Sequence, residues 1–277
     1  MSALIKRSIT GLVFVVLLVG SLIFNAVSFF VLMTILIILG LWEFYSIANK
    51  EEIYPQKFFG IFIGLVVFIA NYCYAQKLTD ELIFIIIIPL FACIFIYELY
   101  RHIKSPFCNI SYTIAGIVYI ALPLSFFCFF VFKKQGYEIR YDYEIILGFF
   151  IITWIYDTIA YISGVSYGRH KLFKRISPLK SWEGFFTGAI FAVGTAFILS
   201  KYLTELNKVQ WIIMASIIAI TSTFGDLTES MLKRNVKIKD SGKMLPGHGG
   251  VLDRFDGVFL SAPFVFIYLQ FLHILHP

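Results

Sequence analysis

The sequence predicts an all-α, polytopic membrane protein with about nine transmembrane helices. Of its 277 residues, 59% are hydrophobic and only 14% are charged, and the mean hydropathy is +0.84. Soluble domains carry about 25% charged residues, so a water-soluble globular fold is excluded. Because one bilayer crossing takes about 20 apolar residues, the apolar runs use most of the chain. We therefore expect a single membrane-embedded domain over residues 1–277.

Nine charge-poor windows predict the crossings in order. The first five are nearly pure Ile, Leu, Val and Phe, and lie at residues 9–25, 27–47, 58–76, 82–99 and 112–132. The last four contain ionisable residues inside them or at their edges, and lie at residues 144–163, 184–203, 209–232 and 257–275. Asn25 is the only polar break between the first two windows, so one long bent helix is the alternative there. We expect residues 1–143 to be mainly scaffold and residues 144–277 to be the catalytic half.

The basic residues predict the orientation. With nine crossings, six of the 23 Lys and Arg residues fall on one side, and these are Lys77, Lys133, Lys134, Arg140, Lys201 and Lys208. All others fall on the opposite side, which the positive-inside rule makes cytoplasmic. Lys6 and Arg7 precede the first window without an A-x-A cleavage site, which predicts an uncleaved anchor. We expect an integral protein of a bacterial inner membrane.

Two features of the first half have simple readings. Gly60 and Gly64 form a GxxxG pair, which permits close helix packing within the chain or at a homodimer interface. The four cysteines show no CxxC pairing, so we assign them no metal or redox role.

The second half places acids where they are costly in a membrane. Asp157 lies inside the sixth window. In the eighth, helical spacing puts five polar residues on one stripe, namely Ser222, Asp226, Glu229, Ser230 and Lys233. The alternative reading is an amphipathic helix end with an ordinary Glu229–Lys233 ion pair. That reading leaves Asp226 unexplained, because no basic residue lies within one turn of it.

The loops after the sixth and eighth windows are basic, and the second is also rich in glycine. In the second, Gly249 and Gly250 follow His248, and Asp253 and Asp256 come soon after. Such a turn can present N–H groups to phosphate, while carboxylates supply the oxygen ligands that Mg²⁺ prefers. The chain has no GxxxxGK[ST] loop, no strand-GxGxxG-helix unit and no HExxH pair. These residues therefore indicate a metal-bound polyphosphate site.

The segment Ser230–Asp256 closely resembles the signature of the phosphatidate cytidylyltransferase family: S-x-x-K-R, K-D, P-x-H-G-G and D-R-x-D all occur. With DTIAYISG and SPLKSWEG upstream, the resemblance covers about residues 150–257. It implies that CTP and phosphatidic acid react to CDP-diacylglycerol and pyrophosphate at the cytoplasmic face. It also implies a divalent metal centre at Asp226 and Asp253, with Mg²⁺ alone or with a second, monovalent cation.

Asp256 is expected either as a third metal ligand or as a cap at the start of the last helix. The expected roles of all the site residues divide into three sets. The metal set is Asp226, Asp253 and Asp256; the substrate-binding set is Asp157, Lys180, Ser230, Gly249 and Gly250; the catalytic set is Lys233, Arg234, Lys239, Asp240, His248 and Arg254. Expected partners are CTP, phosphatidic acid and membrane lipids, without nucleic acid. The competing functions are a CTP-dependent lipid kinase and a secondary transporter of an anionic solute. The transporter is less favoured, because transporters often have two related halves, whereas the polar residues in the second half of this chain have no counterpart in the first half.

Overall fold

The computed structural model describes residues 3–135, 138–238, 240–242 and 249–275. Among these residues, eight helices are long and apolar enough to cross a membrane, and a shorter apolar stretch, Thr10–Phe24, lies near the N-terminus. The predicted all-α membrane fold with about nine crossings is confirmed. The chain forms two compact units, unit 1 (residues 1–141 and 235–255) and unit 2 (residues 142–234 and 256–277), and each is described by itself.

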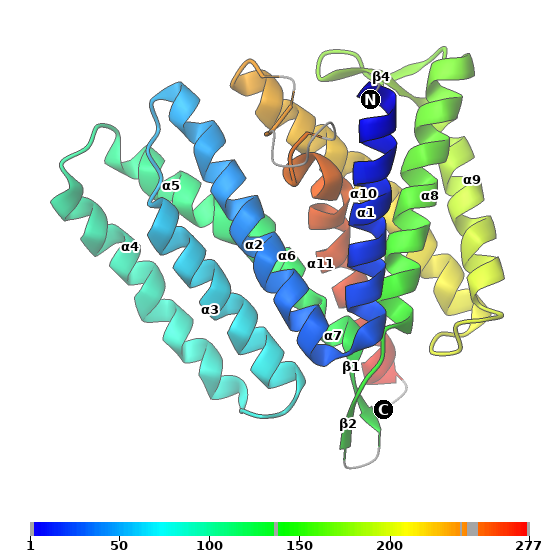
Figure 1. Ribbon diagram of the computed structural model, residues 1–277, viewed down its shortest axis with the longest axis horizontal. Coiled ribbons are helices and arrows are strands. Elements are labelled where there is room, and N and C mark those ends of the chain that lie inside the picture. Colours follow the sequence, from blue (N-terminus) through cyan, green and yellow to red (C-terminus); the bar gives the residue numbers. More distant parts are fainter. Residues whose placement is uncertain (1–2, 136–137, 239, 243–248, 276–277) are drawn as a thin grey trace. The chain divides into compact units, whose positions relative to one another are not determined.

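Unit 1 contains the helices of the first half of the chain and the loop that follows the eighth predicted crossing (Figure 1). Within it, α3 packs against both α2 and α4. Its elements are α1 (Ala3–Phe24), α2 (Ala26–Ala48), η1 (Asn49–Glu51), α3 (Lys57–Ala75), η2 (Glu81–Ile86), α4 (Ile87–Arg101), α5 (Pro106–Gly116), the π-helical η3 (Ile117–Ala121), α6 (Leu122–Phe126), α7 (Cys128–Val131), β1 (Phe132–Gln135) and β2 (Glu138–Tyr141).

The break between α1 and α2 is a helix cap. Asn25 is extended, its side chain accepts a hydrogen bond from Ser28 N at 2.8 Å, and the Ser28 hydroxyl accepts one from Asn25 N at 3.1 Å. This reciprocal capping box satisfies N–H groups at the start of α2. The prediction of two helices, rather than one long bent helix, is therefore confirmed.

The GxxxG pair in α3 packs inside unit 1. A Cβ atom at Gly60 would lie 2.5 Å from the Tyr45 hydroxyl, and one at Gly64 would lie 2.6 Å from Leu41 Cδ1. Both neighbours belong to α2. The glycines thus allow α2 and α3 to approach closely, and the homodimer stays a prediction.

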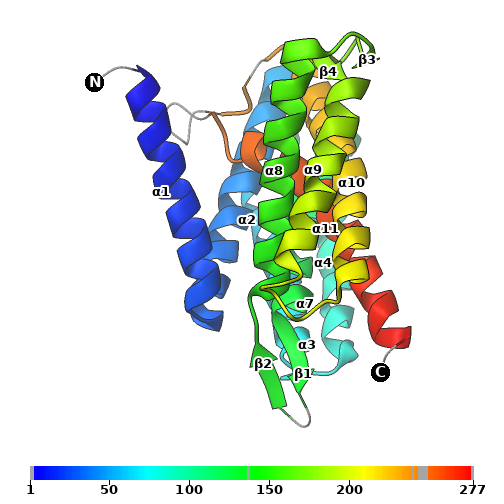
Figure 2. The same ribbon diagram turned by 90° about the vertical axis from the view of Figure 1, so that its right-hand side faces the viewer.

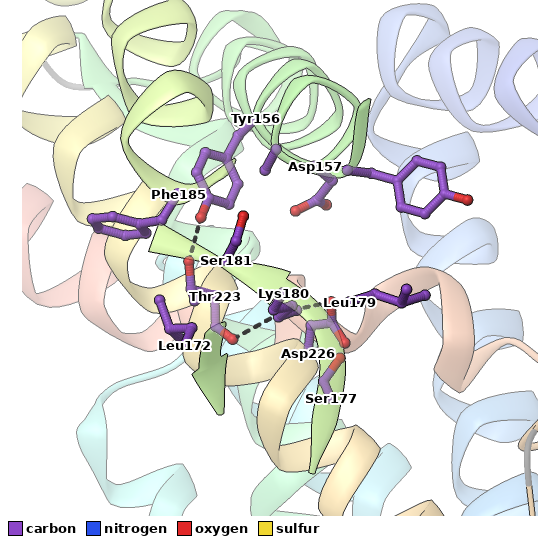
Figure 3. A pocket seen from close by; sticks show the side chains of 12 residues that line it. Tyr156, Asp157, Leu172, Ser177, Leu179, Lys180, Ser181, Phe185, Thr223 and Asp226 are labelled. Carbon is purple, nitrogen blue, oxygen red and sulfur yellow. Dashed lines mark hydrogen bonds and ion pairs between the residues drawn. The ribbon is translucent and has the colours of Figure 1, made fainter. Parts of the chain in front are cut away.

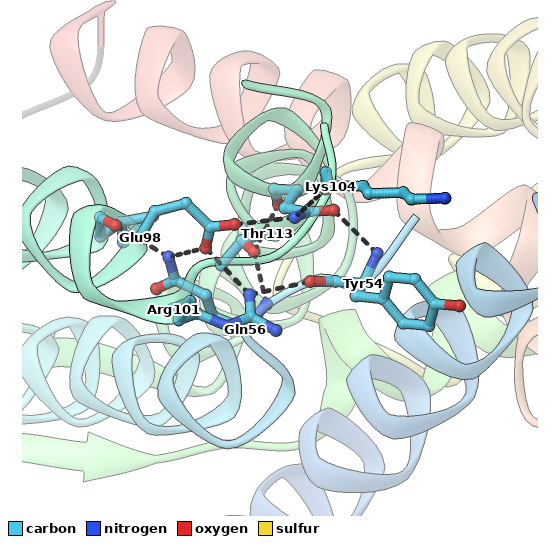
Figure 4. A network of polar contacts seen from close by, with 8 residues as sticks. Tyr54, Gln56, Glu98, Arg101, Lys104 and Thr113 are labelled. Carbon is cyan, nitrogen blue, oxygen red and sulfur yellow. Dashed lines mark hydrogen bonds and ion pairs between the residues drawn. The ribbon is translucent and has the colours of Figure 1, made fainter. Parts of the chain in front are cut away.

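A buried polar network joins α4, α5 and the segment before α3 (Figure 4). The Glu98 carboxylate, 5% exposed, accepts hydrogen bonds from Gln56 Nε2 at 2.8 Å, Asn109 Nδ2 at 2.7 Å and Arg101 Nη1 at 2.9 Å. Arg101 also donates to the Tyr54 carbonyl at 2.8 Å. Because every partner belongs to the same unit, the network stabilises the packing of these helices.

Unit 2 contains α8 (Glu144–Tyr167), β3 (Lys171–Phe173), β4 (Ser177–Ser181), α9 (Trp182–Leu199), α10 (Lys208–Asn235) and α11 (Leu252–Leu275), except that α10 ends and α11 begins in unit 1. The helices α8 and α9 lie side by side (Figure 2). A Cβ atom at Gly184 would lie 2.6 Å from the Ala160 carbonyl oxygen. The absence of a side chain at Gly184 therefore allows the backbones of α8 and α9 to come into contact.

Two antiparallel hairpins were not predicted. In unit 1, β1 pairs with β2, with Phe132 opposite Tyr141; in unit 2, β3 pairs with β4, with Lys171 opposite Ser181. Both are short and carry several polar or charged residues, so they lack the apolar alternation by which strands are recognised. The second hairpin contains a predicted site residue, since Lys180 lies in β4.

Candidate active site

Three carboxylates meet in unit 2. One carboxylate oxygen from each of Asp226, Glu229 and Asp256 lies within 4.8 Å of the others. Asp226 and Glu229 come from one face of α10, and Asp256 comes from α11. We call these three residues the acidic cluster. Oxygen ligands at this spacing suit a hard divalent cation, so the residues fit the metal that the resemblance implies.

A glycine crossing brings the acids of the two helices together. A Cβ atom at Gly225 would lie 2.5 Å from the Asp256 carbonyl oxygen, and one at Gly257 would lie 2.1 Å from Ser222 Oγ. Each glycine is adjacent in sequence to an acid of the cluster. The main chains of α10 and α11 therefore touch at the level of the cluster, and this contact sets the separation of the carboxylates.

Asp226 has a basic partner from another element. Lys180 Nζ, on β4, lies 2.6 Å from Asp226 Oδ2, and it also donates to the Thr223 carbonyl at 3.2 Å. Ser230 Oγ donates to Asp226 Oδ1 at 3.2 Å. Asp226 has no basic residue within one turn of its own helix, and its basic partner comes instead from the second hairpin.

A cavity of about 250 Å³ opens beside this pair (Figure 3). Its polar wall includes Asp157, Lys180 and Asp226, and its apolar wall includes Phe185 and Leu179. Asp157 Oδ1 accepts a hydrogen bond from Ser222 Oγ at 3.0 Å. The cavity thus joins both signs of charge to an apolar surface, as a site for an amphipathic or charged ligand requires.

The remaining predicted residues of α10 occupy different environments. Lys233 forms an ion pair with Glu229, whose side chain is 1% exposed. The predicted i,i+4 pair is therefore present, but it is buried and adjoins the acidic cluster, so it is no ordinary surface pair. Arg234, at the helix end, is exposed.

In unit 1, Asp253 contacts the signature loop, by which we mean the described residues 236–238, 240–242 and 249–251. Its Oδ2 atom accepts hydrogen bonds from Ser241 N at 3.0 Å and Gly250 N at 2.8 Å, and it lies 2.9 Å from Ser241 Oγ. Gly249 has φ +83°, a conformation that glycine adopts without steric cost. Ser241, Gly249 and Gly250 thus lie around a carboxylate of the D-R motif.

Other predicted positions are exposed or lie outside the description. Asp240 and Arg254 are exposed, whereas Lys239 and His248 lie outside the described residues. Asp256 does not cap the last helix, because α11 begins four residues earlier, at Leu252. The glycine crossing instead places it inside the helix, in the acidic cluster.

Sequence reasoning missed Glu43 of α2. This side chain is 3% exposed and accepts hydrogen bonds from the signature loop, at Ser241 Oγ (2.7 Å) and Val251 N (2.7 Å). A single acid within an apolar run was the available signal, because such a residue is costly in a membrane.

Comparison with known proteins identifies the family. The model of the cytidylyltransferase family matches residues 5–272. The chain belongs to the cytidylyltransferase family. It is therefore a transferase enzyme of the membrane, and the resemblance found in its signature is confirmed.

Named relatives of this cytidylyltransferase come from several bacteria. It is 30% identical over 260 residues to the phosphatidate cytidylyltransferase of Haemophilus influenzae, covering 84% of this chain and 86% of the relative. It is 33% identical over 225 residues to that of Rickettsia prowazekii, covering 79% and 92% respectively. A segment of 126 residues is 41% identical to that of Thermotoga maritima, covering 43% and 47%.

Proposed function

We propose that this cytidylyltransferase transfers the cytidylyl group of CTP to phosphatidic acid, which gives CDP-diacylglycerol and pyrophosphate. The observation that carries the proposal is the intact signature from Ser230 to Asp256 in a chain whose relatives are named for this reaction. The acidic cluster and the adjoining cavity in unit 2 support it with suitable chemistry.

The proposed cofactor is Mg²⁺, held by Asp226, Asp256 and Glu229 in unit 2, with Asp253 as the further ligand implied by the family. When bound, the ion would offset phosphate charge and stabilise the departing pyrophosphate. Lys180 holds Asp226 by the ion pair at 2.6 Å. Ser222 holds Asp157 toward the same cavity.

The reaction needs charge neutralisation more than acid–base catalysis. The phosphate of phosphatidic acid is already anionic, so one of its oxygens can attack the α-phosphorus of CTP while the bond to the pyrophosphate oxygen breaks. In such transfers the protein mainly positions the reactants and offsets charge. We assign charge neutralisation to Lys180, Lys233, Arg234, Lys239 and Arg254, and phosphate binding to the backbone N–H groups at Gly249 and Gly250.

Product analysis tests the proposal. Protein purified in detergent should release pyrophosphate from CTP only when phosphatidic acid and Mg²⁺ are both present, and CDP-diacylglycerol should form in equal amount. Release of CDP with a phosphorylated lipid alcohol would instead identify the CTP-dependent kinase. Absence of either product, together with anion uptake by vesicles containing the protein, would favour the transporter.

Substitution of Arg254 distinguishes a catalytic role of the basic residues from simple attraction to anionic lipid. Lys carries the same charge but lacks the bidentate fork of Arg, so Arg254→Lys should lower kcat at least about tenfold. The matched control is Lys174→Gln, at an exposed position outside the signature, where loss of one lipid-attracting charge is worth about 1 kcal/mol. A kcat for Arg254→Lys close to that of the wild type would contradict a positional role, because that variant keeps the charge and loses only the fork.

We also propose that the protein lies in the inner membrane with its active site facing the cytoplasm, because basic residues are concentrated on that side. In a background without the native cysteines, Lys171→Cys should react with an impermeant thiol reagent only from the cytoplasmic side. Lys201→Cys, at the opposite end of α9, should react only from outside. Reversed or two-sided labelling would contradict this orientation.

A further inference from the structure

Glu43 of α2 is held in a dense set of contacts with the signature loop. Its Oε1 atom accepts from Ser241 Oγ at 2.7 Å, and its Oε2 atom accepts from Val251 N at 2.7 Å and Leu252 N at 3.2 Å. Ser241 lies 198 positions away in the sequence. A carboxylate accepting N–H groups at the first turn of α11 also suits the positive end of that helix.

The loop is shaped to admit this carboxylate. A Cβ atom at Gly250 would lie 1.6 Å from Glu43 Oε1, and one at Gly242 would lie 2.0 Å from the same oxygen. Both glycines therefore leave the space that the carboxylate fills. The two signature-loop glycines and the α2 acid are complementary in shape as well as in hydrogen bonding.

Ser241 connects Glu43 to Asp253. Its hydroxyl oxygen lies 2.7 Å from Glu43 Oε1 and 2.9 Å from Asp253 Oδ2, and its backbone N–H donates to Asp253. We infer that Glu43 is a positioning residue, which fixes the signature loop through Ser241 and the start of α11 and thereby orients Asp253. The role given to Asp253 in catalysis rests on the proposed function, whereas the attachment of the loop does not.

The geometry predicts which substitutions are tolerated. In Glu43→Gln, the amide oxygen can still accept from Val251 N and Leu252 N. Its NH₂ group can donate to Ser241 Oγ, whose own proton then goes to Asp253. Glu43→Leu has neither acceptor, so three hydrogen bonds are lost. The Gln variant should therefore rescue what the Leu variant loses.

Hydrogen exchange measured on the full chain in detergent tests the attachment. In Glu43→Leu, the amides of Val251 and Leu252 should exchange at least tenfold faster than in the wild type, relative to a reference peptide in α8. Glu43→Gln should stay within threefold. The control is Glu98→Leu, which removes another buried acid of unit 1, whose hydrogen bonds among the described residues go to Gln56, Arg101 and Asn109. In that variant the loop amides should be unchanged. Unchanged protection in Glu43→Leu would overturn the inference.

Turnover tests the consequence for Asp253. The Mg²⁺ concentration for half-maximal rate should rise at least tenfold in Glu43→Leu and less than threefold in Glu43→Gln and Glu98→Leu. If Glu43→Leu fails to fold, Ser241→Ala tests the positioning role instead, because it removes only the connecting hydroxyl. It should raise the Mg²⁺ requirement at least threefold. An unchanged requirement in the variant that folds would overturn the positioning role. A wild-type protein inactive with CTP and phosphatidic acid would defeat the proposed function alone, since the exchange result would still stand.

Discussion

Asp226→Asn is expected to lower the turnover of CTP at least about a hundredfold while the protein stays folded. The substitution removes one of the three carboxylates of the acidic cluster and the charged partner of Lys180. Loss of groups that merely support a metal ligand costs about 10–100-fold, so loss of a ligand should cost at least as much. Steady-state release of pyrophosphate at saturating substrates measures the effect.

The control for this prediction is Asp80→Asn, which makes the same substitution at an exposed aspartate outside the site. It should retain the wild-type rate. If Asp226→Asn kept more than about a tenth of the wild-type rate with unchanged Mg²⁺ dependence, the assignment of Asp226 as a metal ligand would be wrong.

Asp253→Asn should be nearly as damaging, although it preserves the loop. The Oδ2 atom of Asp253 accepts hydrogen bonds from the N–H groups of Ser241 and Gly250. The amide oxygen of asparagine can take over this acceptor role. The charge is lost, however. We therefore expect a fall in kcat of at least about a hundredfold, with the hydrogen exchange of the loop close to that of the wild type.

Asp253→Ala provides the comparison, because it removes both the charge and the acceptor. It should show the same loss of turnover together with faster exchange at Gly250 and Ser241. If the Asn variant were active and only the Ala variant inactive, Asp253 would be a structural residue of the loop and not a ligand.

The sequence allowed the membrane fold to be predicted because that fold depends on composition within short windows. The capping box at Asn25 is equally local, as it involves residues three positions apart. The acids of α10 were also found, since helical spacing places Asp226 and Glu229 on one face. What these predictions share is that each depends on residues close together in the chain.

The partners of these acids could not be predicted in the same way. Lys180 reaches Asp226 from a hairpin whose strands lack a recognisable pattern. Glu43 reaches a loop about 200 positions later, and no local pattern specifies which polar group a lone buried acid will contact. The first half of the chain was expected to be scaffold, yet one of its side chains holds the signature loop in unit 1.

The glycine crossing of α10 and α11 has a consequence for the stability of unit 2. Between helices in a membrane, packing and hydrogen bonds replace the hydrophobic effect as the cohesive force. Here they include the close contacts at Gly225 and Gly257 and the bond from Thr221 Oγ1 to Ser261 Oγ at 2.9 Å. These contacts hold the two helices together at a point where three carboxyl groups lie within 4.8 Å of one another.

A divalent cation bound by carboxylates of both helices would add to their cohesion and so act as a folding ligand. At a hundred times its Kd, it would add about 2.7 kcal/mol to the free energy of unfolding. The melting temperature in detergent should accordingly rise with Mg²⁺ in the wild type and not in Asp226→Asn. An equal rise in both would assign the effect to cations elsewhere on the protein. The same carboxylates would then link the supply of the ion to the lifetime of the folded enzyme in the membrane, independently of whether substrate is present.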